Sequence, residues 1–211
     1  MSSEYWDPKR IEQYLGLVGQ IPHRTEGESV LLEILPLNVH RVLDIGTGDG
    51  RMIALLRAVR SDIEAIGIDF SPIMLEKATT RFQGDSAVQI VNHNIDHPLP
   101  DLGTFDMVVS SFAIHHVSDS RKKALYAEVF EILNPGGLFA NLEHVSSPTD
   151  KLHEDFYSAL GMDVSQEDAS NQCAPVEPQL DWLRDIGFLD VDCYWKWREL
   201  ALLAGFHTGI A

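Results

Sequence analysis

The sequence is poor in cysteine and in basic residues. Its 211 residues contain two cysteines, Cys173 and Cys193. They match neither a disulfide framework nor a zinc-binding pattern, and they favour a reducing compartment. Lys and Arg total 16 against 32 Asp and Glu, giving a formal net charge of −16. Because such a chain repels phosphate backbones and anionic lipid surfaces, neither nucleic-acid nor membrane partners are expected.

Long apolar runs are also missing. No stretch approaches the ~20 apolar residues that a membrane-spanning helix needs. The start of the sequence, residues 1–7, has neither the basic region nor the apolar region of a signal peptide, so a cytoplasmic location is expected. Hydrophobic residues make up 45% of the sequence, which is enough to bury the core of a single domain over residues 1–211.

Short apolar runs alternate with helical patterns along the chain. The predicted strands cover residues 41–45, 63–69, 86–93, 105–111, 138–144, 191–197 and 200–206. The predicted helices cover residues 8–19, 25–35, 51–60, a segment that begins after Ser71, 119–133 and 148–187. Thr25 and Glu28 are expected to cap the second helix, which Pro36 ends, and Ser71 is expected to cap the fourth. The turn 134–137 ends helix 119–133, and Pro175 and Pro178 break helix 148–187. This order predicts an α/β fold with a doubly wound, mostly parallel seven-stranded sheet. The last two strands are too close together for a crossover, so they should form an antiparallel hairpin.

A glycine-rich loop follows the first strand and begins a helix. In open parallel sheets, ligands bind at this edge, where glycines let the backbone approach a ligand closely. A dinucleotide fingerprint needs a third glycine at position 51, which is Arg51 here. The spacing of Asp44, Gly46, Gly48 and Gly50 instead suits a nucleoside with an amino-acid tail. Asp69 ends the second strand, where a carboxylate suits the ribose hydroxyls of either cofactor class.

Four segments together resemble a known family. Residues 42–50 (VLDIGTGDG), 67–75 (GIDFSPIML), 105–116 (FDMVVSSFAIHH) and 133–137 (LNPGG) are similar to ordered motifs of the class I S-adenosylmethionine-dependent methyltransferases. The resemblance covers about residues 40–144. It implies a Rossmann-like fold, with S-adenosylmethionine as cofactor.

The resemblance also implies a division of the chain and a cofactor site. Residues 1–36 would form a helical lid, 37–144 the cofactor-binding core, 145–187 the acceptor-pocket segment and 188–211 the strand hairpin. Asn94 stands where the family often has an aspartate that contacts adenine, and its side-chain oxygen can accept the same hydrogen bond. Arg24 would pair with the methionine carboxylate. The expected cofactor-binding residues are Arg24, Asp44, Gly46, Thr47, Gly48, Asp69, Phe70, Met74, Asn94, Ile95, Ser110 and Ser111.

Methyl transfer needs orientation and a dry site more than a strong catalytic group, so the acceptor is not readable from the sequence. The catalytic candidates are His115, His116, Glu143 and Tyr14. No metal is expected, although Glu143, His144 and His115 include suitable ligand types.

The sequence therefore predicts methyl transfer to a small-molecule O, N or S acceptor by a monomer or homodimer. Three alternatives stay open: a methyltransferase acting on tRNA or protein, a non-catalytic S-adenosylmethionine-binding protein and, disfavoured by Arg51, a nicotinamide dehydrogenase.

Overall fold

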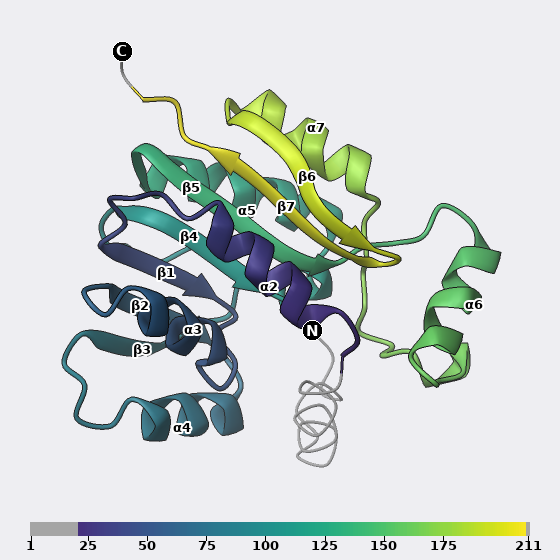
Figure 1. Cartoon of the computed structure of the whole chain (residues 1–211), viewed down its shortest axis with the longest axis horizontal. Coiled ribbons are helices and arrows are strands. Elements are labelled where there is room, and N and C mark those ends of the chain that lie inside the picture. Colours follow the sequence, from purple (N-terminus) through teal and green to yellow (C-terminus); the bar gives the residue numbers. More distant parts are fainter. Residues whose placement is uncertain (1–20, 210–211) are drawn as a thin grey trace.

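The computed structural model describes residues 21–209. Seven strands form one sheet in the order β3-β2-β1-β4-β5-β7-β6 (Figure 1). All neighbouring pairs from β3 to β5 are parallel, whereas β7 runs antiparallel to both β5 and β6. The predicted α/β fold with a C-terminal antiparallel hairpin is therefore confirmed. The strands are β1 Arg41–Ile45, β2 Glu64–Asp69, β3 Val88–Asn92, β4 Phe105–Ser111, β5 Leu133–His144, β6 Leu189–Trp197 and β7 Leu200–Phe206.

Helices cover both faces of the sheet, as a doubly wound fold requires. In Figure 1, α2 and α3 lie in front of the sheet, whereas α5 and α7 lie behind it. Helix α6 lies beyond the edge of the sheet at which β1 ends (Figure 1). The helices are α2 Arg24–Glu33, α3 Arg51–Val59, α4 Pro72–Arg81, α5 Asp119–Ile132, α6 Asp150–Ala159 and α7 Val176–Ile186, with 3₁₀ turns η2 Ile114–His116 and η3 Val164–Gln166. In residues 21–209, no helix is long and apolar enough to cross a membrane.

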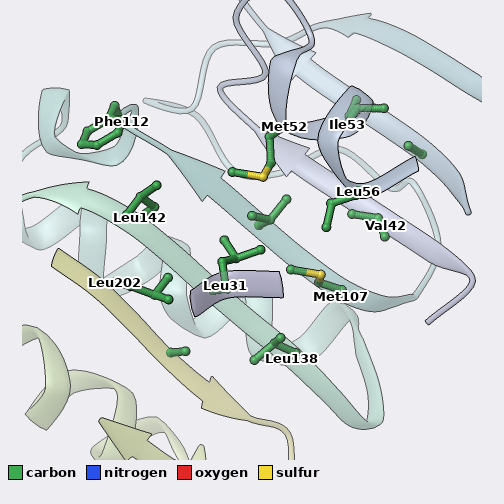
Figure 2. Close-up of a cluster of buried hydrophobic side chains, with 14 of the residues drawn as sticks. Leu31, Val42, Met52, Ile53, Leu56, Met107, Phe112, Leu138, Leu142 and Leu202 are labelled. Carbon is green, nitrogen blue, oxygen red and sulfur yellow. The ribbon is translucent and has the colours of Figure 1, made fainter. Parts of the chain in front are cut away.

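Each face of the sheet carries its own apolar core. On the front face, Leu31 of α2 and Leu56 of α3 pack with strand residues such as Met107 (Figure 2). On the opposite face, Leu125 of α5 and Leu183 of α7 pack on the strands. Burial on both faces explains why the central strands read as continuous apolar runs in the sequence.

One predicted helix cap is wrong. Helix α2 begins at Arg24, and its N-cap is His23, which makes no side-chain cap. Thr25 therefore lies inside the helix, and the carboxylate of Glu28 accepts hydrogen bonds from Arg24 and Arg51 instead of closing a capping box. A carboxylate pairs more strongly with a charged guanidinium that binds both of its oxygens than with a single neutral backbone amide, so Glu28 pairs with the arginines.

Other boundaries differ by small amounts. Helix α2 ends at Glu33, before Pro36. Strand β3 is shorter than predicted, and the turn 134–137 lies within β5. Pro178 does not break α7, because it lies in the first turn, where no backbone donor is needed. The cap at Ser71 is confirmed. The predicted helix 8–19 lies outside the described residues.

Candidate functional site

The glycine loop lies between β1 and α3 at the carboxyl edge of the sheet. The backbone N–H groups of Gly46 and Thr47 both donate to the Ile68 carbonyl, at 2.9 Å. Gly46 has φ +70°, and a Cβ there would lie 2.1 Å from the Cβ of Ala113. Gly48 has φ +56°, and a Cβ there would meet nothing within 4 Å. The loop therefore packs tightly at Gly46 and leaves open space at Gly48.

Asp69 joins the first two β–α junctions. Its Oδ2 accepts from the N–H of Gly48 at 2.9 Å, and its Oδ1 accepts from the N–H of Ser71 at 2.8 Å. Burial raises the pKa of Asp69, although the backbone hydrogen bonds act in the opposite direction. The loop and the acid that the sequence analysis paired by spacing are therefore in direct contact.

Asp44 is buried under the loop with one oxygen unpaired. Its Oδ2 accepts from the Thr47 hydroxyl at 2.7 Å, whereas Oδ1 has no hydrogen-bond partner in the described structure. Burial is the main cause that raises the pKa of Asp44 to about 7. A buried acceptor without a donor is costly, so this oxygen fits a ligand that brings a hydrogen-bond donor.

Arg24 is buried at the carboxyl end of β4. Its Nη2 lies 3.4 Å from the Ser111 hydroxyl, and its guanidinium carbon lies 5.1 Å from the centre of the Phe112 ring. Ser110 differs from Ser111, because its hydroxyl is fully buried and donates to the Ile45 carbonyl at 2.8 Å. Of the two predicted serines, Ser111 is the one that contacts the charged group.

The residues expected around adenine follow β2 and β3. Met74 and Ile95 are buried, and Phe70 is partly buried. The N–H of His93 donates to the Asp69 carbonyl at 2.8 Å, which holds the two segments side by side. The Oδ1 atom of Asn94 accepts from the N–H of Asp96 at 3.0 Å, and its second lone pair can still accept from a ligand.

His115 and Glu143 form a buried dyad at the ends of β4 and β5. The Nδ1 atom of His115 lies 2.5 Å from Oε1 of Glu143, whose Oε2 has no partner among the described residues. Burial raises the pKa of Glu143 to about 7. Burial, with repulsion from His144, lowers the pKa of His115 well below its usual value. Both shifts favour a neutral pair.

Two more histidines surround the dyad. The ring of His116 lies 4.0 Å from that of His115 and is tilted against it by 46°, and burial lowers the pKa of His116 to about 3. The ring of His144 lies 5.5 Å from that of His115, and its Nε2 lies 3.0 Å from Glu199, which also binds His153. The structure therefore brings three of the four catalytic candidates together. The fourth, Tyr14, lies outside the described residues.

The sequence analysis missed three residues of this region. Glu199 binds His144 from 55 positions away, and His153 binds Glu199 from 46 positions away. Ser170 holds the Nδ1 atom of His116 at 3.1 Å. No motif or spacing marks these contacts, because they depend on how the chain folds back. Within residues 21–209, no group of His, Cys, Asp and Glu side chains is arranged to hold a metal ion.

The sheet order, the glycine loop and the position of Asp69 are typical of nucleoside-binding α/β enzymes. The methyltransferase domain family matches residues 42–137. The chain is 30% identical to a demethylmenaquinone methyltransferase of Roseiflexus castenholzii over 83% of this chain and 77% of the relative. It belongs to the class I S-adenosylmethionine-dependent methyltransferases, and S-adenosylmethionine is its cofactor.

Further relatives agree with this assignment. A carboxy-S-adenosyl-L-methionine synthase of Helicobacter hepaticus is 25% identical over 83% of this chain and 79% of the relative. The structure of an O-methyltransferase family protein from Burkholderia thailandensis superposes with a TM-score of 0.71 at 16% identity, covering 90% of this chain. The chain spans 57% of that structure's length, and this likeness supports the fold alone.

Substitution of Gly46 and of Gly48 by alanine should destabilise the protein by different amounts. Gly46→Ala should cost more than about 2 kcal/mol, because it adds a clash with Ala113 to an unfavourable φ. Gly48→Ala should cost only about 1 kcal/mol, because it adds strain without a clash. Urea unfolding of both variants checks this order. Equal losses would contradict the tight packing of Gly46.

Because burial raises the pKa of Glu143, we expect the stability of the protein to depend on pH. The pKa of Glu143 is higher in the folded state than in the unfolded chain. Burial of its carboxylate therefore does not lower the free energy of unfolding below about pH 4.5, and lowers it progressively more as the pH rises to about 7. The cost reaches at most about 3 kcal/mol. Glu143→Gln should therefore stabilise the protein at pH 8 more than at pH 5, as measured by thermal unfolding. A constant difference between the two pH values would show that Glu143 does not change its ionisation.

Proposed function

We propose that this enzyme methylates a small-molecule O, N or S acceptor that loses a proton, and that the His115–Glu143 dyad takes this proton. The observation that carries the proposal is the dyad itself, buried at the end of β5, where one oxygen of Glu143 has no partner in the part of the chain that the structure describes. Such an oxygen fits an acceptor that brings an O–H or N–H donor.

The dyad lies close to the cofactor loop. Ala113, whose side chain lies against Gly46, is only two residues from His115. The segment from Ser111 to His116 therefore borders the loop at one end and the dyad at the other. This continuity supports an acceptor bound between the glycine loop and Glu143.

The tautomer of His115 decides whether it can act as a base. When Glu143 is ionised, it accepts the Nδ1 proton of His115, and Nε2 keeps a lone pair that can accept a proton from the acceptor. When Glu143 is protonated, it donates to Nδ1, and the ring proton moves to Nε2. The base is then lost. Glu143 is also placed to stabilise the imidazolium that forms.

The residues of the cofactor site fit S-adenosylmethionine, whose sulfonium supplies the electrophilic methyl group. Asp69 would hold the ribose hydroxyls. Oδ1 of Asp44, which has no partner among the described residues, suits the ammonium of the amino-acid tail, and Arg24 suits its carboxylate. Gly48 leaves room for a close approach of the ligand to the loop backbone.

Two observations favour a small acceptor. The formal charge of −16 opposes binding of a nucleic acid. The Roseiflexus relative is named for a demethylated quinone. A cytoplasmic monomer or homodimer is the simplest form of such an enzyme.

Incubation with methyl-labelled cofactor and separated cell fractions tests the acceptor class. Label should enter the small-molecule fraction. Label confined to tRNA or protein would contradict the proposal, and tight cofactor binding without transfer into any fraction would indicate a non-catalytic binding protein.

Asp69→Asn should weaken the binding of S-adenosylhomocysteine by about tenfold, because it removes a charge from the hydrogen bonds to ribose. Asparagine is preferable to alanine, since its oxygen can still accept from Ser71 or Gly48. Calorimetry measures the affinity, and Asp101→Asn on an exposed loop is the control. Unchanged affinity would remove Asp69 from the ribose site.

Turnover should rise with pH through about 7 and then level off, because His115 acts as a base only when Glu143 is ionised. Glu143→Gln should lower kcat by about 10² and abolish this rise, while cofactor affinity stays unchanged. Glu131→Gln on the exposed side of α5 is the control. A rise that persists in Glu143→Gln would assign it to another group.

A further inference from the structure

Residues 145–174 leave the carboxyl edge of the sheet and return to it beside the dyad. Backbone hydrogen bonds close the base of this segment. The N–H of Ser146 donates to the Ala174 carbonyl at 3.1 Å, and the N–H of Gln172 donates to the His115 carbonyl at 2.8 Å. Helix α6 lies in the far part of the segment, beyond the edge of the sheet (Figure 1). The base is therefore fixed at the dyad, whereas the position of α6 depends on its side chains.

One side chain of α6 lies between two carboxylates. Nδ1 of His153 lies 2.9 Å from Oε1 of Glu199, in the turn between β6 and β7, and its Nε2 lies 3.4 Å from Oε2 of Glu167, which follows η3. A neutral imidazole has one N–H and can donate to only one of the two carboxylates, whereas an imidazolium can donate to both. The geometry therefore fits the protonated form of His153.

The charges around His153 favour the same form. Burial alone would lower the pKa of His153, but its hydrogen bond to Glu199 and the charges of Glu199 and Glu167 raise it above the usual 6.5. Burial alone would raise the pKa of Glu199, but hydrogen bonds from His144 and His153 lower it, so Glu199 is ionised. The ring of Tyr157 lies 5.0 Å from that of His153, and burial raises the pKa of Tyr157, so this hydroxyl stays neutral.

Helix α6 reaches the dyad through one aromatic ring. Phe156 is buried, and its ring lies 5.3 Å from that of His144. The backbone N–H of His144 donates at 2.8 Å to Oε1 of Glu143, the same oxygen that His115 contacts. The position of α6 therefore affects the residues that surround Glu143.

We propose that His153 is a positioning residue: as an imidazolium between Glu199 and Glu167, it holds α6 beside the dyad, and its deprotonation loosens α6 and weakens binding of the acceptor. This inference rests on the proposed function, because it takes the acceptor to bind next to Glu143. The pKa of His153 is higher in the folded state than in the unfolded chain. Its ion pairs are therefore fully formed below about pH 6.5 and are lost as the pH rises through the folded-state pKa.

Hydrogen exchange on the full chain tests the link between His153 and α6 without an acceptor. Protection of the backbone amides of residues 150–159, corrected for the intrinsic rate at each pH, should fall about three- to fivefold between about pH 6 and about pH 9, since partly exposed ion pairs contribute modestly. His153→Arg keeps its positive charge throughout this range and should keep the protection constant. His153→Gln should show the low protection at both ends of the range.

His40→Gln is the matched control. Nδ1 of His40 also lies beside a carboxylate, 3.2 Å from Oδ2 of Asp62, but both side chains are exposed and lie outside the segment 145–174. This variant should keep the wild-type pH dependence of α6.

Transfer of label from methyl-labelled cofactor into the small-molecule fraction of a cell extract tests the effect on the acceptor. At limiting amounts of this fraction, the rate should fall about three- to fivefold above the pKa of His153, whereas at saturating amounts it should stay level, because binding and not turnover is weakened. His153→Arg should remove the fall. Glu167→Gln should move it to lower pH, since one of the two carboxylates that favour the imidazolium is gone. Affinity for S-adenosylhomocysteine should stay unchanged in all variants.

Protection of α6 that does not depend on pH in the wild type, or a fall that persists in His153→Arg, would overturn the proposal. Weaker binding of S-adenosylhomocysteine in His153→Gln would overturn it too, because it would show a general structural role. The dyad is tested separately. If turnover does not rise near pH 7 but α6 protection and the rate at limiting acceptor still depend on His153, the proposed role of the dyad fails and that of His153 stands.

Discussion

The close contact between Gly46 and Ala113 brings the segments that follow β1 and β4 together at the carboxyl edge of the sheet. Only a residue without a Cβ lets the loop after β1 lie directly against the segment after β4. This segment continues to His115, which binds Glu143 at the end of β5. Three neighbouring strands therefore end in one packed unit, which contains the glycine loop and the histidine cluster. Because packed interiors transmit small displacements, a change at the loop would also displace the dyad.

The same edge contains ionisable groups that the fold alone does not need. Asp44 and Glu143 are each 1% exposed, and each keeps one oxygen without a partner among residues 21–209. Burial raises the pKa of both carboxyl groups to about 7. Such groups reduce stability, and natural proteins tolerate them where function requires them. The apolar cores on the two faces of the sheet offset this cost, since the helices that cover them pack on almost uninterrupted apolar strands.

Much of the fold was predictable from the sequence because its signals are local. The apolar run 105–111 and the cap at Ser71 are specified by neighbouring residues. The pairing of the glycine loop with Asp69 follows from a spacing that is typical of nucleotide-binding βαβ units. The pairing of Glu28 with two arginines was not predictable, since Arg51 reaches it from 23 positions away and replaces the expected helix cap. Glu199 was missed for the same reason. Its two histidine partners come from β5 and α6, and only the folded chain brings them together.

The site has two halves that differ in their charged groups: one contains a carboxylate whose pKa is low, and the other contains a carboxyl group whose pKa is about 7. On the loop side, Arg24 and Arg51 donate hydrogen bonds to the buried carboxylate of Glu28 and hold its pKa low, so this carboxylate keeps its charge. On the dyad side, burial keeps His115 and His116 neutral, and Glu143 changes its charge near pH 7. In the proposed reaction, a fixed charge suits a ligand group that must stay in place, whereas a titratable pair suits a group that gives up a proton. Preorganised charges of this kind lower the barrier only where charge develops. In the proposed reaction, the proton is lost at the dyad, so the dyad is the half on which the choice of acceptor would depend.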